Sequence, residues 1–216
     1  MRKVIRIALT KGRIEKKAIE LLTEAGYDCS ELEDKGRKLV FKLKNADIEV
    51  VLAKAADVIT YIEHGVCDAG IVGEDTIMEH GKWFHEILDL GFGKCKFALA
   101  GIKGMNFYEG YSHKVTASKY PKVTKNFFNQ KGIDVEIVKI EGSVELAPIL
   151  NLADAIVDIV ETGSTLRENG LEVYEDVAYI STRLIVNTAS IKLKKAEIDD
   201  LVKRLSAVIS KDENDA

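Results

Sequence analysis

Apolar residues recur along this chain with two alternating periods, one typical of buried strands and one typical of helices. Short unbroken apolar runs predict strands, whereas longer segments with an apolar residue at every third or fourth position predict helices with one buried face. The predicted strands cover residues 4–9, 39–43, 48–52, 69–72, 95–100, 114–117, 135–140, 155–160 and 183–186. The predicted helices cover residues 13–25, 57–65, 121–130, 143–150 and 197–209, and a further helix starts near residue 73.

Strand and helix patterns alternate almost from end to end, which predicts an α/β fold with mainly parallel sheets. The run Leu90-Gly91-Phe92-Gly93 precedes a strand and marks a crossing into a second lobe, and the strand at 183–186 marks the return. We therefore expect lobe I to comprise residues 1–90 plus 180–216, and lobe II residues 91–179. A cleft between two such lobes would be faced by the carboxyl ends of strands, where open α/β sheets bind ligands.

Composition and charge argue against several classes of function. The chain has 216 residues and a formal net charge of −4, which argues against a general nucleic-acid binder. Its three cysteines form no C-x-x-C pair, so we expect reduced thiols in a cytoplasmic protein and no structural zinc site. No segment is long and apolar enough to span a bilayer, and Arg6 interrupts the N-terminal apolar run that a signal peptide would need. The four histidines do not cluster as metal ligands would, so we read them as structural. The sequence alone does not identify the residues that bind a metal.

The most informative segment is the predicted strand at 155–160 with the loop that follows it. The strand carries Asp158 near its end, and Glu161 then leads into Thr162-Gly163-Ser164-Thr165 and a helix start. Glycine lets the backbone approach a ligand closely, and consecutive N–H groups, hydroxyls and a helix start can surround one phosphate. This pattern suits a ribose 5-phosphate site, in which Asp158 would accept bonds from ribose hydroxyls. Alternatively, the tetrapeptide is an ordinary turn with a threonine N-cap, and Glu161 is a capping acid.

Several segments in one order resemble a single family, the short form of ATP phosphoribosyltransferase. The resemblance covers nearly the whole chain. The segments that carry it are the run from Glu141 to Leu166, Lys11-Gly12-Arg13, Asp57 with Thr60-Tyr61 and Glu63-His64-Gly65, Asp68-Ala69-Gly70-Ile71-Val72-Gly73, Asp89-Leu90-Gly91-Phe92-Gly93-Lys94-Cys95, Lys119-Tyr120-Pro121, and Arg183-Leu184-Ile185-Val186-Asn187.

The resemblance implies a two-lobed fold like that of type II periplasmic binding proteins. It implies transfer of phosphoribosyl from phosphoribosyl pyrophosphate to N1 of ATP, giving N1-(5-phosphoribosyl)-ATP and pyrophosphate, with Mg²⁺, in the first step of histidine biosynthesis. Short-form members lack the regulatory domain that binds histidine, and they work with a partner that resembles histidyl-tRNA synthetase. We accordingly expect a homodimer within a hetero-oligomer, with no nucleic acid and no membrane among the partners.

The reaction needs cations where pyrophosphate leaves, and Lys11, Arg13 and Lys54 are the candidate catalytic residues for contacts with the triphosphate and pyrophosphate. The resemblance implies a pyrophosphate-facing cation at the position of Lys54. Alternatively, Lys11 and Arg13 are solvated charges at a helix start, and Lys54 is a plain surface lysine. The family usually has Arg-Ala-Lys-Asp where this chain has Lys54-Ala55-Ala56-Asp57, and lysine cannot make the planar bidentate contact of arginine. Glu145 and Asp75 complete the predicted substrate-binding residues, beside Asp158, Glu161, Thr162, Gly163, Ser164 and Thr165.

Two rival functions compete with this interpretation. A solute-binding or sensor module of the same fold would bind without catalysis, because fold alone does not determine function. Another class of phosphoribosyltransferase is disfavoured because those enzymes usually carry two adjacent acids before the loop, whereas Ile159 follows Asp158 here.

Overall fold

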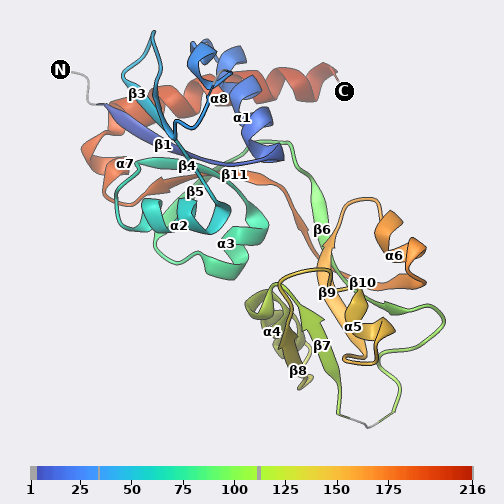
Figure 1. Ribbon diagram of the computed structural model, residues 1–216. Coiled ribbons are helices and arrows are strands. Elements are labelled where there is room, and N and C mark those ends of the chain that lie inside the picture. Colours follow the sequence, from blue (N-terminus) through green and yellow to red (C-terminus); the bar gives the residue numbers. More distant parts are fainter. Residues whose placement is uncertain (1–3, 34, 111–112, 216) are drawn as a thin grey trace. The chain divides into compact units, whose positions relative to one another are not determined.

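The computed structural model describes residues 4–33, 35–110 and 113–215, which form two compact units. The first unit joins the chain up to Gly93 with the chain from Ser181 onward, and the second unit is Lys94–Ile180. The sequence placed these crossings at residues 90/91 and 179/180, within three residues of the observed positions. Each unit is built around one sheet (Figure 1).

The first unit contains a six-stranded sheet flanked by helices. Its strands lie in the order β2 (Val40–Lys42), β3 (Ile48–Ala53), β1 (Ile5–Thr10), β4 (Ala69–Gly73), β11 (Thr182–Asn187) and β5 (Phe84–Asp89). Its helices are α1 (Arg13–Glu24), the short η1 (Ser30–Leu32), α2 (Ala55–Glu63), α3 (Glu74–His80), α7 (Ser190–Leu193) and α8 (Lys195–Asp215). Strand β1 is parallel to both of its neighbours, β3 and β4, while the β2–β3, β4–β11 and β11–β5 pairs are antiparallel.

Both faces of β1 are buried, as its nearly continuous apolar sequence predicts for a central parallel strand. Ile7 and Leu9 pack with Leu22 of α1 and Leu205 of α8 on one face. Ala8 faces the other side, in a cluster with Ile59 of α2. Figure 1 shows α1 and α8 on one side of this sheet and α2 on the other.

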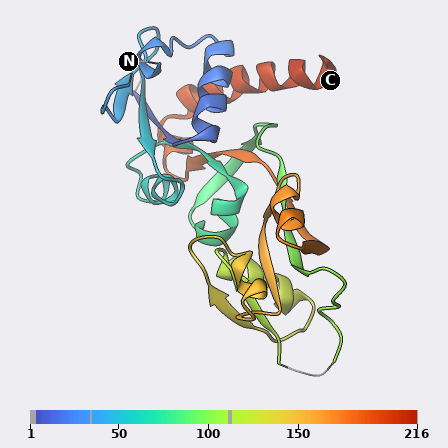
Figure 2. The ribbon, with the colours of Figure 1, turned by 45° about the vertical axis from the view of Figure 1, so that its right-hand side comes forward.

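The second unit contains a five-stranded sheet. Its strands lie in the order β10 (Leu171–Ile180), β6 (Cys95–Ile102), β9 (Ala155–Val160), β7 (Val115–Ser118) and β8 (Glu136–Lys139), and its helices are α4 (Pro121–Gln130), α5 (Leu146–Ile149) and α6 (Ser164–Glu168). Strand β7 is parallel to β8 and β9, whereas β6 is antiparallel to β9 and β10. Figure 2 shows this unit from a second direction.

The structure confirms the α/β class and corrects several details. Both sheets are mixed rather than mainly parallel, because the segments at the crossings, β6, β10 and β11, pair antiparallel with their neighbours. The helix expected at 143–150 covers only Leu146–Ile149, with Glu145 as its N-cap residue. Pro148 therefore lies in the first turn, where a missing N–H costs nothing and no kink is needed. Helix α2 starts at Ala55, so Asp57 lies in the first turn and not at the N-cap.

The closing helix extends further than its sequence pattern predicted. The apolar periodicity predicted a helix that ends at residue 209. The backbone instead continues as helix through Asp215, and Ala216 lies outside the described residues. Among those residues, no helix combines the length and the apolar character needed to cross a bilayer.

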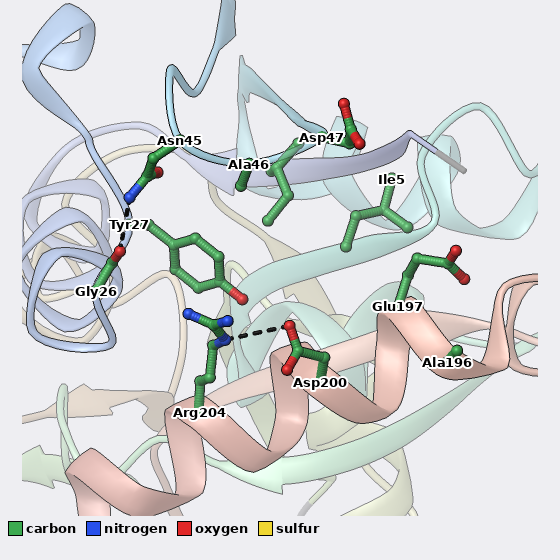
Figure 3. Close-up of a pocket in the computed structure, with 11 residues that line it drawn as sticks. Ile5, Gly26, Tyr27, Asn45, Ala46, Asp47, Ala196, Glu197, Asp200 and Arg204 are labelled. Carbon is green, nitrogen blue, oxygen red and sulfur yellow. Dashed lines mark hydrogen bonds and ion pairs between the residues drawn. The ribbon is translucent and has the colours of Figure 1, made fainter. Parts of the chain in front are cut away.

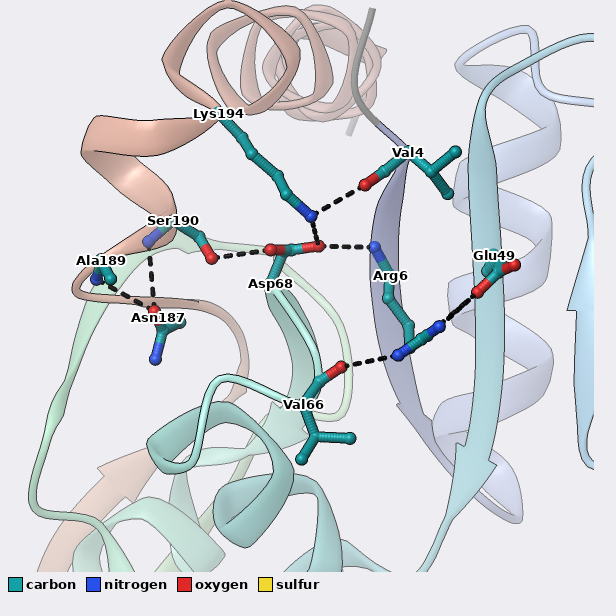
Figure 4. Close-up of polar contacts among 9 residues, drawn as sticks. All are labelled: Val4, Arg6, Glu49, Val66, Asp68, Asn187, Ala189, Ser190 and Lys194. Carbon is teal, nitrogen blue, oxygen red and sulfur yellow. Dashed lines mark hydrogen bonds and ion pairs between the residues drawn. The ribbon is translucent and has the colours of Figure 1, made fainter.

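A buried carboxylate joins three parts of the first unit (Figure 4). Asp68 is 5% exposed and accepts hydrogen bonds from the backbone N–H of Arg6 at 2.8 Å, from Ser190 Oγ at 2.7 Å and from Lys194 Nζ at 2.7 Å. A buried charge is stable only when it is paired and hydrogen-bonded. Asp68 therefore fixes β1, the start of β4 and the α7–α8 turn to one another.

Candidate active site

Two lysines of the first unit lie side by side at the carboxyl edge of its parallel strands. Strands β1 and β3 pair in register through Thr10 and Ala53, and the next residues in each are Lys11 and Lys54. The backbone N–H of Lys11 bonds to the carbonyl of Ala53 at 2.9 Å, which continues the pairing. Both side chains are exposed. Two cations at one sheet edge form a suitable binding place for a polyphosphate.

Arg13 and Asp75 are at the same edge of this sheet. Arg13 opens α1 directly after Gly12, whose φ of 104° is accessible mainly to glycine. Asp75 lies in the first turn of α3, which follows β4, the other parallel neighbour of β1. The structure thus gathers Lys11, Arg13, Lys54 and Asp75 at the carboxyl ends of three neighbouring parallel strands.

The predicted phosphate loop connects β9 to α6 in the second unit. Gly163 is the N-cap residue of α6 and has φ 69° and ψ 10°, a left-handed conformation that favours glycine. The hydroxyl oxygens of Thr162 and Ser164 are 3.0 Å apart, and the Ser164 N–H donates to Thr162 Oγ1 over 3.4 Å. A threonine N-cap, the alternative interpretation of this sequence, is not what the structure contains. The helix has only five residues, so its dipole contributes less than the sequence suggested.

Asp158 lies on β9 just before this loop and is only partly exposed. The pKa of its carboxyl is raised to about 6, chiefly by burial and to a smaller extent by the negative charge of Glu145. A hydrogen bond from the backbone of Ile159 and the positive charge of Lys119 lower the same pKa. The structure therefore brings two predicted substrate-binding acids, Asp158 and Glu145, into electrostatic contact. A carboxyl with a pKa this high is a typical feature of functional sites.

Sequence reasoning missed Lys119 and Arg167. Lys119 follows Ser118, which pairs in register with Val157 of β9, so Lys119 stands beside Asp158 at the carboxyl edge of the second sheet. The segment Lys119-Tyr120-Pro121 was noticed in the sequence, but its place in the sheet depends on strand order. Arg167 lies in α6, and its Nη1 donates to the carbonyl of Thr162 over 3.0 Å.

A small cavity elsewhere in the first unit is a separate feature (Figure 3). It has a volume of about 130 Å³ and is bordered by Tyr27, by the β2–β3 turn at Asp47 and by Arg204 of α8. Ile5 and Ile48, at the amino ends of β1 and β3, also line it. Because Lys11 and Lys54 follow the carboxyl ends of the same strands, the cavity is at the opposite edge of the sheet from the candidate residues.

Among the described residues, no group of three or more histidine, cysteine, aspartate or glutamate side chains is arranged to hold a metal ion. Mg²⁺ in phosphate chemistry is usually bound by one or two carboxylates together with substrate oxygens and water. The acids of the second unit, Asp158 and Glu161, are the donors available next to the loop.

Comparison with known proteins gives consistent results. A sequence model of the HisG family, described as ATP phosphoribosyltransferase, matches residues 54–207. An ATP phosphoribosyltransferase of Clostridium kluyveri is 61% identical over 206 residues, which are 95% of this chain and 94% of the relative. An enzyme of the same name from Clostridium acetobutylicum is 58% identical over 210 residues, which are 97% of this chain and 98% of the relative.

Solved structures agree with both the family and the fold. A chain in the ATP phosphoribosyl transferase (HisG:HisZ) complex from Thermotoga maritima matches with a TM-score of 0.81 and 33% identity, over 96% of this chain and 99% of that one. The periplasmic aliphatic sulphonate binding protein SsuA from Escherichia coli matches with a TM-score of 0.60 and 13% identity, over 98% of this chain and 70% of that one, which shows the fold alone. The relatives are enzymes, which disfavours the non-catalytic alternative. The chain belongs to the ATP phosphoribosyltransferase family, whose reaction is the first step of histidine biosynthesis.

Proposed function

We propose that two sets of residues in this chain carry the family's reaction, the transfer of phosphoribosyl from phosphoribosyl pyrophosphate to N1 of ATP with release of pyrophosphate. As the bond at the anomeric carbon breaks, positive charge develops on the sugar and negative charge on the departing pyrophosphate. The enzyme must therefore hold the 5-phosphate firmly and supply cations to the leaving group.

The loop from Thr162 to Thr165 is our candidate for binding the 5-phosphate. The observation that carries this proposal is the left-handed conformation of Gly163 in the loop that follows Asp158 and the end of β9. Asp158 is half-buried, and the hydroxyl-bearing residues of the loop are exposed to solvent. Backbone N–H groups and hydroxyls are the donors that a phosphate requires. Asp158, with Glu145 beside it and Glu161 after it, would accept hydrogen bonds from the ribose hydroxyls.

Lys11, Arg13 and Lys54 are our candidates for contacts with the leaving pyrophosphate and the triphosphate of ATP. Their support is the register of β1 and β3, which sets Lys11 and Lys54 side by side. Lys54 acts as a point charge rather than as the bidentate fork of the arginine that the family usually has at this position. Asp75 is our candidate for hydrogen bonding to the nucleotide. Adenine N1 needs no general base on this scheme, because positioning alone brings it to the anomeric carbon.

Mg²⁺ is the cofactor that this chemistry requires. Asp158 and Glu161 are the residues that would hold it through water. When bound, Mg²⁺ adds positive charge at the pyrophosphate oxygens.

We also propose that the chain works with a regulatory subunit similar to histidyl-tRNA synthetase, as a homodimer within a hetero-oligomer. The support is the match to a chain of the Thermotoga maritima HisG:HisZ complex over nearly its full length.

The test is pyrophosphate release from ATP, phosphoribosyl pyrophosphate and Mg²⁺, with and without a synthetase-like subunit. Two loop variants locate the 5-phosphate. Gly163→Val adds a side chain where a Cβ would already be 3.2 Å from Arg167 Nη1, and it should abolish binding of phosphoribosyl pyrophosphate. Thr165→Val removes one hydroxyl and should weaken that binding by about 1.5–3 kcal/mol while the melting temperature stays nearly constant. A loss of stability without a loss of affinity in both variants would exclude the loop from the active site.

A further inference from the structure

Arg167 holds two consecutive carbonyl groups of the phosphate loop. Its Nη1 donates to the carbonyl of Thr162 over 3.0 Å, and its own backbone N–H donates to the carbonyl of Gly163 over 3.1 Å. Its side chain therefore folds back from the last turn of α6 onto the loop. The same Nη1 is 3.2 Å from the position that a Cβ of Gly163 would occupy, so it packs directly against the glycine.

These two bonds fix the orientation of the loop N–H groups. A trans peptide is planar, and its N–H points away from its C=O. With the Thr162 carbonyl held by Arg167, the N–H of Gly163 points in the opposite direction, away from the Arg167 guanidinium. The Gly163 carbonyl is held by the backbone N–H of Arg167, and the N–H of Ser164 donates to Thr162 Oγ1 over 3.4 Å. No described peptide bond is cis, so this geometry applies to both planes.

The other contacts within the loop join Thr162 and Ser164, and the one made by the Ser164 N–H is long, at 3.4 Å. Glycine is the residue with the widest range of backbone conformations, and both planes flank Gly163. Helix α6 has five residues, too few to be stable by itself. Only Leu166 of α6 joins the hydrophobic core of the second unit. Arg167 is also the single basic residue between positions 158 and 168, among the acids Asp158, Glu161 and Glu168.

We propose that Arg167 is the positioning residue of the phosphate loop: its guanidinium holds the peptide plane between Thr162 and Gly163 so that the Gly163 N–H binds the 5-phosphate of phosphoribosyl pyrophosphate. This inference rests on the proposed function of the loop. It assigns to Arg167 a role exerted through the backbone, with the ligand contact made by the Gly163 N–H.

The experiment compares Arg167→Met, Arg167→Lys and the control Arg204→Met in the full chain. Arg204→Met makes the same substitution on α8, where the guanidinium pairs with Asp200. Three quantities are measured: affinity for ribose 5-phosphate, affinity for ATP, and hydrogen exchange of the amides at 162–165 in the free protein. Arg167→Met should weaken ribose 5-phosphate binding at least about tenfold, speed the exchange of the loop amides, and leave ATP affinity unchanged. Arg167→Lys should behave alike, because its shorter side chain ends before the Nη1 position, and Arg204→Met should match the wild type.

Each other result overturns the inference. Faster exchange with unchanged affinity would make the Arg167 contact merely structural. Weaker affinity with unchanged exchange, or full rescue by lysine, would show direct binding of phosphate by charge. The failure of the proposed function has a different signature: a wild-type protein that does not bind ribose 5-phosphate, and a Gly163→Val variant that retains full affinity for phosphoribosyl pyrophosphate.

Discussion

Replacing Asp158 by asparagine should stabilise the folded protein at alkaline pH while it damages the active site. Burial is the main cause that raises the pKa of this carboxyl from 3.8 to about 6. The folded state therefore holds this proton more tightly than the unfolded state does. The free energy of unfolding falls as pH rises from about 3.8 to about 6 and stays level above that, because both states are then ionised.

The magnitude follows from the two pKa values. Each pH unit between them costs about 1.36 kcal/mol, so the ionised carboxylate lowers the stability by on the order of 3 kcal/mol above pH 6. Some of this cost is already present at pH 4.5, and about 2 kcal/mol is added between pH 4.5 and 8. Asparagine has nearly the same shape and carries no charge, so Asp158→Asn should remove this pH-dependent cost. Glu145→Gln should act in the same direction with a smaller effect, because the charge of Glu145 is a weaker cause than burial.

The assay is urea unfolding of wild type and Asp158→Asn at pH 4.5 and 8, with affinity for phosphoribosyl pyrophosphate measured at pH 8. The stability gain should be larger at pH 8 by about 2 kcal/mol, and the affinity should fall by about 1.5–3 kcal/mol because a ribose contact to a charged acceptor is lost. An equal gain at both pH values would refute the assignment of a buried, proton-retaining carboxyl. Undiminished affinity would refute the proposed ribose contact.

Three further predictions concern the first unit. Lys54→Ala should lower kcat by about 10- to 150-fold, because one charged hydrogen bond to the leaving group is lost. Lys54→Arg should retain or raise activity, and a change in KM alone would contradict this role. Gly70→Ala should lower the free energy of unfolding by roughly 1–3 kcal/mol, because its Cβ would be 2.8 Å from Val58 Cγ1. Thermal unfolding checks this, and Gly142→Ala, where the structure leaves open space and φ is not positive, controls for the loss of a glycine. Asp68→Asn should cost roughly 2–3 kcal/mol in urea unfolding, since it leaves Lys194 without its carboxylate, and a neutral outcome would show that the buried contact contributes nothing.

Apolar patterning predicted the buried strands and the edge strands β2 and β8, and it missed the edge strands β5 and β10. Strands β1 and β9 have nearly unbroken apolar sequences, and their observed bounds differ from the expected ones by one residue or none. Strand β10 carries three acids and pairs with β6 through two register shifts, so no regular alternation is visible in its sequence. Strand β5, at an edge of the first sheet, is mostly exposed, which weakens the hydrophobic signal in its sequence.

The order of strands determines which polar residues meet, and the sequence does not contain that order directly. Lys11 and Lys54 are far apart in the chain and become neighbours only because β1 and β3 pair in parallel. Lys119 reaches Asp158 for the same reason, through β7 and β9. A rule that polar residues after parallel strands gather at one edge would have included Lys119 among the candidates, because it comes two residues after the strand expected at 114–117.

Arg167 shows a different limit of sequence reasoning. A loop pattern such as Thr162-Gly163-Ser164-Thr165 reveals which atoms could bind a phosphate, but not what keeps those atoms oriented when glycine leaves the backbone free. That function requires a group outside the pattern that returns to the loop, and the return depends on the conformation of one long side chain. The residues that donate to a ligand can thus be proposed from a motif, whereas the residues that orient those donors emerge only from contacts such as the bond from Arg167 Nη1 to the Thr162 carbonyl. Rates and affinities measured on Arg167 variants would therefore report on the preorganisation of the loop separately from the strength of its donors.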